Sequence, residues 1–448
     1  MPSRTPPRDA DPNRFGTDVS LRRSRRSFLV AAGTTGLVVL AGCADVYGAD
    51  RDAVDDPLCL WNERFVEEIQ HFRGGNVAPT RRGALLNVAT FDAINGVAAA
   101  AGDDHFEPYL ADPSAAPADG SPVAALAGAA HETMTSLYGG EFEPALEATL
   151  AAAGGGDVDA GERWGRAVAT DLLAHRDDEY ATSIYVPCDD ATEPGCFRGD
   201  WNPVHAAIDP WTLTTADQFG PDGPPPLESE AYADAWWEVY ERGNDADDRP
   251  REHVDVASFW RGAPGSPRPP NMWNVVTQRL VVDEDLPLLE EARLFALLSL
   301  ALVDAGIAGS RAKYDYGFWR PRTAIHEADR DGNQETHADR TWRPRAVGGS
   351  PEYTSTLAAY GGAACHVLEG VLASGDYSFE LGGDIRTGTA GEDEGVVRSF
   401  DSLEDALSES LDSRIYVGNH FRFALEDGRE QGERIGEWVL DSVLRPVG

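Results

Sequence analysis

A lysine and an arginine seven positions apart, Lys313 and Arg320, have the residue types and spacing of an anion-binding pair. Lys313 is the single lysine of a 448-residue chain that contains 38 Lys plus Arg. An ammonium is a compact point charge and a guanidinium is a planar fork, so the two cations are not interchangeable at a tight anion site. Seven positions are about two helical turns, which places both residues on one helix face, roughly 10 Å apart. Pro321 is expected to end that helix.

A second candidate segment, residues 350–357, leads into a run of small residues that predicts a helix over 358–373. A turn at a helix N-terminus presents unpaired backbone N–H groups and the positive end of the helix dipole, which together attract anions. The Ser355 hydroxyl adds a hydrogen-bond donor at this position. Serine at a helix start also serves as an N-cap, so a purely structural role for Ser355 is the alternative interpretation.

Arg414 and His420 form a third candidate pair, six positions apart. This spacing puts them on different faces of a continuous helix. They converge only if the chain turns at Gly418 and Asn419, which predicts a turn there and a further helix running to about Leu444.

The charge balance limits the partners of this chain. Asp plus Glu number 76 against 38 Lys plus Arg, which gives a formal net charge of -38. Binding of nucleic-acid phosphates needs a basic patch, so nucleic acid is excluded as a partner, and an anionic membrane surface is excluded for the same reason. Strong acidity with a single lysine indicates adaptation to molar salt, where the Debye length is about 3 Å and the net charge hardly repels a small anion.

Apolar residues recur at helical spacing along most of the chain from residue 60 onward, and strand-type alternation is scarce. The helical segments are 79–101, 121–138, 142–153, 160–176, 230–242 and 287–310. A segment rich in Pro and Gly interrupts them at 184–226. The pattern predicts an all-α fold of two helical bundles. The N-terminal bundle spans 58–245 with a loop-rich connection, and the C-terminal bundle, over 246–448, carries the anion site.

Residues 1–42 have the pattern of an export signal, with a twin-arginine pair at Arg25 and Arg26. The apolar run that follows is too short for a comfortable membrane span. It ends in Leu-Ala-Gly before Cys43, which resembles a lipoprotein processing box, and 43–57 reads as an acidic tether. We expect an exported protein, held at the outer face of the cytoplasmic membrane or the cell surface only by a lipid on Cys43. An unprocessed apolar anchor is the alternative.

The remaining cysteines suggest structure rather than metal chemistry. Cys188 and Cys196 flank a loop and can pair in an oxidising compartment, although spacing alone does not establish the bond. Cys365 lies in an apolar helical run and is expected to be a buried thiol. No grouping of Cys and His has the spacing of a zinc site.

Taken together, the three candidate segments resemble the vanadium-dependent haloperoxidase family, which shares its active-site plan with type 2 phosphatidic acid phosphatases and bacterial acid phosphatases. The first family motif is Lys, six residues and Arg-Pro, as at Lys313, Arg320 and Pro321. The third is Ser-Arg, five residues and His, as at Ser413-Arg414 and His420. Short landmarks in family order extend the resemblance over nearly the whole exported part: Trp61-Asn62-Glu63, Phe91-Asp92, Phe259-Trp260, Phe379-Glu380-Leu381 and Arg398-Ser399-Phe400-Asp401.

The middle motif departs from the family pattern Pro-Ser-Gly-His. This chain has Thr354-Ser355-Thr356-Leu357, so the serine is kept, Thr356 stands for the glycine and Leu357 for the histidine that serves as acid/base. The Thr356 side chain is expected to crowd the oxyanion, although its backbone N–H remains a donor. Leucine transfers no proton. His366, nine positions on, should face away along a helix, and His326 has no spacing argument behind it.

The resemblance implies a role for each site residue. Lys313, Arg320 and Arg414 would neutralise the oxygens of a tetrahedral vanadate, and Ser355 and the Thr356 N–H would bind further oxygens. His420 would bond vanadium through a neutral imidazole whose other nitrogen is held by an acceptor. Phosphate would occupy the same site. Lys313→Ala is expected to remove most of the oxyanion affinity and to leave the helical fold intact.

Three functions follow from the resemblance. The first is a haloperoxidase-like enzyme that uses vanadate, hydrogen peroxide and halide, weakened because positioned proton transfer is worth ~10²–10⁴-fold in rate. The second is an acid phosphatase that acts on a phosphoester at the same site without vanadium. The third is a non-catalytic phosphate- or vanadate-binding protein, with Leu357 as the mark of lost chemistry.

Overall fold

The computed structural model describes residues 56–72, 75–177, 192–246, 248–262, 265–282, 284, 286–372, 377–382 and 397–447. These residues are mostly helical, and the described part of the chain adds only one two-stranded antiparallel sheet. The predicted all-α class is confirmed. The signal over 1–42, Cys43 and the tether up to residue 55 lie outside the described residues, and so does Cys188.

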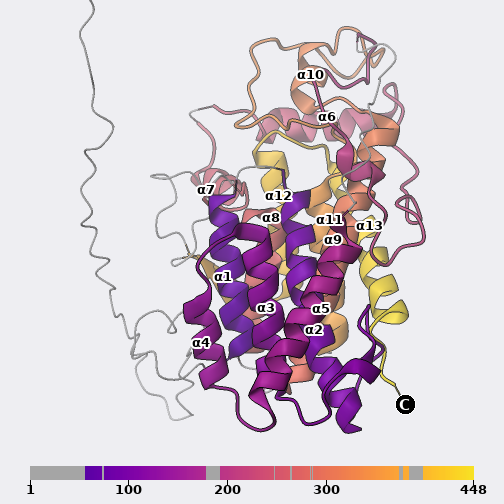
Figure 1. Ribbon diagram of the computed structural model, residues 1–448. Coiled ribbons are helices and arrows are strands. Elements are labelled where there is room, and N and C mark those ends of the chain that lie inside the picture. Colours follow the sequence, from indigo (N-terminus) through magenta and orange to yellow (C-terminus); the bar gives the residue numbers. More distant parts are fainter. Residues whose placement is uncertain are drawn as a thin grey trace, which may run out of the picture. The chain divides into compact units, whose positions relative to one another are not determined.

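The helices follow one another in chain order, with longer connections after α2, α5, α10 and α11 (Figure 1). The first five are α1 Pro57–His71, α2 Val77–Ala101, α3 Pro122–Tyr138, α4 Glu143–Ala151 and α5 Val158–His175. Next come α6 Glu230–Arg242, α7 Arg251–Phe259, α8 Arg268–Val281, α9 Leu288–Tyr316 and α10 Pro321–His326. The last are α11 Thr356–Leu372, α12 Leu403–Tyr416 and α13 Arg422–Ser442, with the strands β1 Phe379–Gly382 and β2 Val397–Phe400 between α11 and α12.

Side-chain caps fix where several of these helices begin. Asp56, Ser121, Asp157, Ser229 and Ser402 each accept a hydrogen bond from a backbone N–H in the first turn of the helix that follows. Such caps satisfy N–H groups that have no partner inside the helix. The segments predicted from apolar spacing therefore appear as helices with ends shifted by a few residues.

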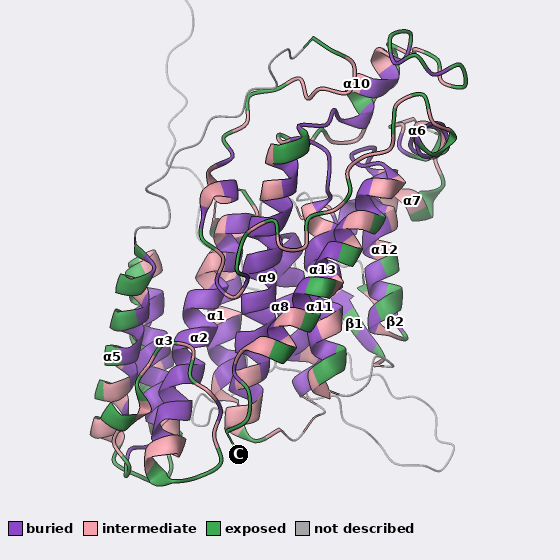
Figure 2. Ribbon diagram, turned by 90° about the vertical axis from the view of Figure 1, so that its right-hand side faces the viewer, coloured by how far each residue is buried: buried purple, intermediate pink, exposed green. Residues whose placement is uncertain are grey.

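The central helix is α9, which packs against α2, α8, α11 and α13. Figure 2 shows it almost wholly buried. Both α2 and α9 are long and apolar enough to cross a membrane by length and composition alone, but their apolar windows are 78% and 94% buried inside the protein. One hydrophobic cluster takes residues from α1 through α13, so the helices of both predicted bundles share a core. The boundary at 245/246 stays a prediction.

Helices α11 and α13 approach each other along a row of glycines. A Cβ at Gly428, Gly432 or Gly436 of α13 would lie 2.1–2.9 Å from a backbone oxygen of α11. Those oxygens belong to Ser355, Ala359 and Ala363. Because real Cβ atoms do not come this close, only glycine allows this packing at the three positions. The contact fixes the start of α11 against the chain that follows His420.

The structure corrects the expected relationship of Lys313 and Arg320. Lys313 lies in α9, but that helix ends at Tyr316, where Gly317 adopts the left-handed conformation (φ 51°) and donates its N–H to the Lys313 carbonyl. Arg320 therefore lies beyond the helix and not on its face. Pro321 does not end a helix either, because it is the first residue of α10, a position that suits a residue without an N–H.

The predicted turn between Arg414 and His420 is confirmed. Helix α12 ends at Tyr416, Gly418 has φ 75°, and α13 starts at Arg422. A Cβ at Gly418 would lie 2.5 Å from the Gly243 carbonyl oxygen, so the tight turn requires glycine. The turn keeps Arg414 near enough to His420 for its charge to lower the pKa of the imidazole.

Candidate active site

His420 is held by Glu352 in one tautomer. The two side chains are 5% and 0% exposed, and His420 Nδ1 lies 2.9 Å from Glu352 Oε1. On its other side, His420 Nε2 lies 3.0 Å from Arg320 Nη1. A guanidinium only donates, so Nε2 must accept and Nδ1 must carry the proton that is donated to Glu352. Burial and the cations Arg320, Lys313 and Arg414 lower the pKa of His420 well below its ordinary value, which keeps the imidazole neutral.

Arg320 uses all five of its N–H groups within the protein. Nε donates to the Ser350 carbonyl at 2.8 Å, and Nη2 donates to Ser350 Oγ at 3.2 Å and the Pro351 carbonyl at 3.1 Å. Nη1 donates to the Asn419 carbonyl at 2.8 Å and to His420 Nε2. Arg320 therefore joins the turn before α11 to the turn before α13. Burial lowers its pKa to about 10, and Glu352 opposes this effect.

Lys313 holds the turn that carries Glu352. Its ammonium donates to three backbone carbonyls, those of Pro351, Glu352 and Thr354, at 2.8, 2.9 and 2.5 Å. Burial and the nearby Arg320 lower the pKa of Lys313 well below its ordinary value. Three acceptors around one nitrogen need three N–H groups, which only the charged ammonium supplies, so the turn stabilises the cation. A guanidinium, which is planar, could not place its donors at these three points.

Arg414 has guanidinium N–H groups that make no hydrogen bond within the described chain. It is 7% exposed, and its one side-chain hydrogen bond in the described chain is a long one, from Nη1 to the Trp260 carbonyl at 3.4 Å. Its buried Nε has no hydrogen-bond partner there. Burial and the charges of Arg320 and Arg261 lower the pKa of Arg414 to about 10, and no carboxylate opposes them. A buried guanidinium with unused N–H groups is costly unless it binds an acceptor.

Around His420, buried cations outnumber buried carboxylates. Among the described residues, Lys313 and Arg320 act on one buried carboxylate, Glu352, whose pKa burial raises to about 7 while these two cations oppose the rise, and Arg414 adds a third buried cation. Glu352 Oε1 accepts from both His420 and the Phe421 N–H, and Oε2 has no hydrogen-bond partner within the described chain. The two hydrogen bonds to Oε1 and the charges of Arg320 and Lys313 favour the ionised form of Glu352, whereas burial opposes it. The excess positive charge attracts an anion.

The middle segment lies at the start of α11, as predicted, with different roles for its residues. Ser355 is fully buried, and its Oγ accepts the Ala358 N–H at 3.4 Å, as an N-cap does. The Thr356 side chain packs toward Gly309 of α9, where a Cβ would lie 3.2 Å from Thr356 Oγ1. Gly309 thus makes room for the side chain that replaces the family's glycine. Leu357 is half-buried in the first turn and supplies no proton donor or acceptor.

Neither of the two other histidines considered from the sequence bonds to the cluster in the described chain. His326 Nε2 lies 2.9 Å from the Trp342 carbonyl. His366 packs against Gly436 of α13, in agreement with the prediction that it faces away. Cys365 is buried and its thiol lies 3.7 Å from the Leu403 carbonyl, which confirms the predicted buried thiol.

Glu352 is the site residue that the sequence interpretation did not name. An acceptor for the second nitrogen of His420 was expected, but no partner was assigned. The available signal was a glutamate between Pro351 and Tyr353, just before a helix start in the middle segment. Carboxylates at such positions are usually exposed helix caps, and only the fold shows that this one points inward to His420.

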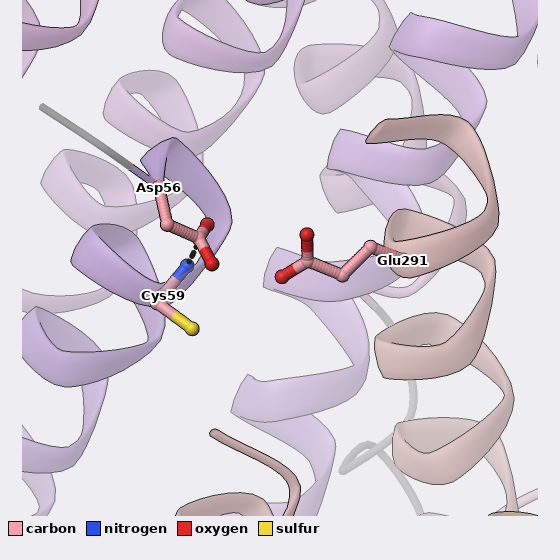
Figure 3. Close-up of side chains that lie close together, drawn as sticks. All are labelled: Asp56, Cys59 and Glu291. Atoms are coloured by element: carbon pink, nitrogen blue, oxygen red, sulfur yellow. Dashed lines mark hydrogen bonds between the residues drawn. The ribbon is translucent and has the colours of Figure 1, made fainter. Parts of the chain in front are cut away.

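A separate group of ligand-type side chains lies where α1 begins and α9 passes. The potential ligand atoms of Asp56, Cys59 and Glu291 are all within 4.8 Å of one another (Figure 3). Asp56 accepts the Cys59 N–H at 2.9 Å and thereby caps α1. The cap accounts for the position of Asp56, and we assign no ion to this group.

Comparison with known proteins places the site in a family context. Residues 293–448 match the family model of the VCPO second helical-bundle domain. Vanadium chloroperoxidase of Curvularia inaequalis is 28% identical over 211 residues, a match that covers 36% of this chain. That match covers only 34%, about a third, of the fungal protein's own length.

Solved structures share the fold over most of both chains. The crystal structure of a bacterial vanadium-dependent iodoperoxidase has a TM-score of 0.70 at 24% identity and covers 87% of this chain and 97% of that one. The holo form of a bacterial vanadium-dependent chloroperoxidase has a TM-score of 0.64 at 15% identity, with coverage of 88% and 98%. These likenesses establish the fold of the described chain.

Proposed function

We propose that this chain, whose residues 293–448 match the VCPO second helical-bundle domain, binds vanadate beside His420 and oxidises halide with hydrogen peroxide. One observation carries the proposal. Three buried cations, Lys313, Arg320 and Arg414, lower the pKa of the buried imidazole of His420, and among the described residues one buried carboxylate, Glu352, bonds that imidazole. An oxyanion supplies the negative charge that this arrangement lacks.

The donor set fits a tetrahedral oxyanion. Arg414 has unused N–H groups. The N–H groups of Arg320 and Lys313 all bond protein atoms, so these two cations would contribute charge, and the hydrogen bond from Arg320 Nη1 to His420 Nε2 would have to open when an oxyanion binds. The first N–H groups of α11, beginning with Thr356, add the positive end of the helix dipole. His420 Nε2 is the nitrogen that would bond vanadium. Bound vanadate would supply the Lewis-acidic centre that activates hydrogen peroxide toward halide.

The protein's own residues hold that donor set in place. Glu352 keeps the His420 Nε2 lone pair directed toward Arg320, and Lys313 fixes the turn on which Glu352 lies. The aromatic residues Phe318 and Trp319 are buried beside this turn and limit the access of water. We assign Lys313 a mainly positioning role, because its three N–H groups all bond backbone carbonyls.

The leucine at position 357 leads us to expect slow halide oxidation by this protein. It stands in the first turn of α11, where the family resemblance places the acid/base histidine, and offers no group that transfers a proton. The loss of positioned proton transfer is worth ~10²–10⁴-fold in rate and leaves anion binding intact. This residue is the observation that favours the second candidate function, a non-catalytic phosphate- or vanadate-binding protein.

A direct test loads the full chain with vanadate in molar salt and measures bromination that depends on hydrogen peroxide. Halide oxidation that appears only with vanadate supports the haloperoxidase. Phosphoester hydrolysis that vanadate inhibits would support the acid phosphatase instead. Phosphate or vanadate binding without turnover in either assay would support the non-catalytic protein, and the absence of binding would overturn all three.

We further propose that the protein is exported and held at the outer face of the membrane by a lipid on Cys43. The twin-arginine pair and the processing box before Cys43 support this proposal. Mass spectrometry of the N-terminal peptide tests it, since the lipid should be found on Cys43. Cys43→Ser should release the protein into the medium; if the variant stays in the membrane fraction, the anchor is elsewhere.

A further inference from the structure

The segment that covers Arg320 is a strap formed by residues 345–350, between α10 and α11. A Cβ at Gly348 would lie 2.5 Å from Arg320 Cζ, 2.6 Å from Nη2 and 2.9 Å from Nε. All three atoms belong to the guanidinium, so the Gly348 backbone lies directly against this group. The guanidinium is held by hydrogen bonds to residues on both sides and cannot move aside without breaking them, so this contact requires glycine.

Asn419 bonds both the strap and the arginine beneath it. Its Oδ1 accepts the Gly348 N–H at 2.8 Å, and its backbone carbonyl accepts from Arg320 Nη1 at 2.8 Å. Asparagine side chains in turns usually bond backbone groups a few residues away. The Gly348 N–H is 71 positions away, so this hydrogen bond joins two distant segments and does not merely stabilise the turn before α13.

Side-chain packing contributes little to holding the middle of the strap. Val347 is 54% exposed, and a Cβ at Gly349 would meet no atom within 4 Å. Two backbone N–H groups at the start of the strap bond the Val417 carbonyl at 3.0 and 3.5 Å, and its end is bonded to Arg320. Between these two attachments, the hydrogen bond to Asn419 is what keeps the strap on the guanidinium.

We propose that Asn419 is a positioning residue of the oxyanion site: it holds Gly348 against Arg320 and thereby fixes the guanidinium beside His420 Nε2. The inference rests on the proposed oxyanion site and adds to it a residue that acts through Arg320. When an oxyanion opens the bond from Arg320 Nη1 to His420, the bonds of Nε and Nη2 to residues 350–351 can remain, so the guanidinium keeps its place. The anion then has no long side chain to order, which is worth about two- to tenfold in affinity.

The first test needs no anion and uses NMR of the full chain in molar salt. Asn419→Ala removes the acceptor of the Gly348 N–H and keeps the backbone carbonyl that bonds Arg320. Hydrogen exchange of the Gly348 amide should become at least about tenfold faster. The ¹⁵N resonance of His420 Nε2 should move toward that of an imidazole nitrogen without a hydrogen bond. Asn419→Asp keeps an acceptor for Gly348 and should restore the protection of its amide.

Calorimetric titration with inorganic phosphate and with orthovanadate, in molar salt, is the second test. Asn419→Ala should bind both anions about two- to tenfold more weakly than the parent. Gly348→Ala should weaken binding at least as much, because its Cβ would displace the Arg320 guanidinium. Gly349→Ala is the matched control at the next position, where a Cβ meets no atom within 4 Å, and should bind as the parent does.

The outcomes separate this inference from the proposed function. If the parent binds both anions and Asn419→Ala binds them as well or more tightly, Asn419 does not position Arg320, and the oxyanion site stands without it. If the parent binds neither anion, the proposed site is wrong and this inference falls with it. Spectral changes in Asn419→Ala that are confined to the strap, Arg320 and His420 support a positioning role. Changes spread through the helices would show a general structural role and overturn the inference.

Discussion

Glu352 and His420 form a buried pair in which the carboxylate, 2.9 Å from Nδ1, determines which imidazole nitrogen carries the proton. Because Nδ1 donates to Glu352, the lone pair of Nε2 is directed at Arg320. The pair thus fixes the orientation of the His420 imidazole and makes Nε2 its nitrogen with a free lone pair for an acceptor or ligand role.

Glu352→Gln should destabilise the fold by about 3 kcal/mol, because the buried Lys313 and Arg320 would lose the carboxylate that opposes their loss of charge. The same change should leave His420 as a mixture of tautomers, since an amide either accepts from or donates to Nδ1. Chemical denaturation in molar salt measures the first effect and ¹⁵N NMR of the imidazole the second. Glu380→Gln, on the exposed face of β1, is the control and should change neither quantity. A single tautomer in Glu352→Gln would contradict the assignment.

Lys313→Ala should cost at least about 3 kcal/mol of unfolding free energy, since it leaves three buried carbonyls without a donor. The sequence predicted loss of oxyanion affinity with an intact fold, and the three carbonyl contacts change that expectation. Arg311→Ala, two positions earlier in α9, removes a surface ion pair with Asp315 and should cost less than about 1 kcal/mol. Equal unfolding midpoints for the two variants would show that Lys313 does not hold the turn.

Leu357→His should raise peroxide-dependent bromination by the vanadate-loaded protein by ~10²–10⁴-fold, since it restores positioned proton transfer. Vanadate affinity should change far less, because the cations that bind the anion are untouched. Leu357→Asn adds a polar group without proton transfer and should stay at the parent's rate. A Leu357→Asn rate as high as that of Leu357→His would mean that polarity, and not acid/base chemistry, limits turnover.

Gly309 and Thr356 should be energetically coupled. A Cβ at position 309 would lie 3.2 Å from Thr356 Cγ2 and Oγ1, closer than packing normally allows. Gly309→Ala should therefore destabilise the parent, but stabilise a Thr356→Gly background by up to about 1 kcal/mol, the usual gain of alanine over glycine in a helix. The coupling from the double-mutant cycle should be about 1 kcal/mol. Additive effects would contradict the contact.

Acid should destabilise the protein partly through His205. Burial lowers its pKa from 6.5 to about 4, so the unfolded chain takes up a proton in this range and the folded chain does not. The stabilisation is complete above pH 6.5 and is lost as pH falls toward 4, by at most about 3 kcal/mol. Asp92 acts in the opposite sense, because burial raises its pKa to about 6 and stability is lost as pH rises through that range.

The contribution of His205 is separated from that of Asp92 by measuring the unfolding free energy of the parent and of His205→Gln between pH 4 and 7. The difference between parent and variant should shrink as the pH falls. A constant difference for His205→Gln would rule out its contribution.

The sequence predicted the secondary-structure elements correctly where a single pattern of apolar residues identifies them. The 3.6-residue apolar period gave the helices, and Gly418 gave the turn that brings Arg414 to His420. The same reasoning was wrong for Lys313 and Arg320. Seven positions matched a helix face, but Gly317 ended α9 between them, and a single glycine carries too little signal to outweigh the spacing.

The tertiary contacts of backbone atoms could not be predicted from the sequence. The three carbonyls around Lys313 and the alignment of Glu352 with His420 depend on the path of one turn, which no residue pattern encodes. Likewise, the crowding expected from Thr356 is avoided by a glycine 47 positions away in α9, a compensation that becomes visible only when the two helices are packed. The roles assigned to the candidate vanadate-binding residues stay predictions, although the fold brings these residues together.

The glycine row between α11 and α13 has an evolutionary consequence. Backbone contacts at Gly428, Gly432 and Gly436 hold the first turn of α11 in place regardless of the side chain at position 357. The scaffold can therefore lose its acid/base residue without losing the geometry into which that residue fits. A change of Leu357 to histidine therefore needs no remodelling of the surrounding helices, and two of the leucine codons allow it by a single base change.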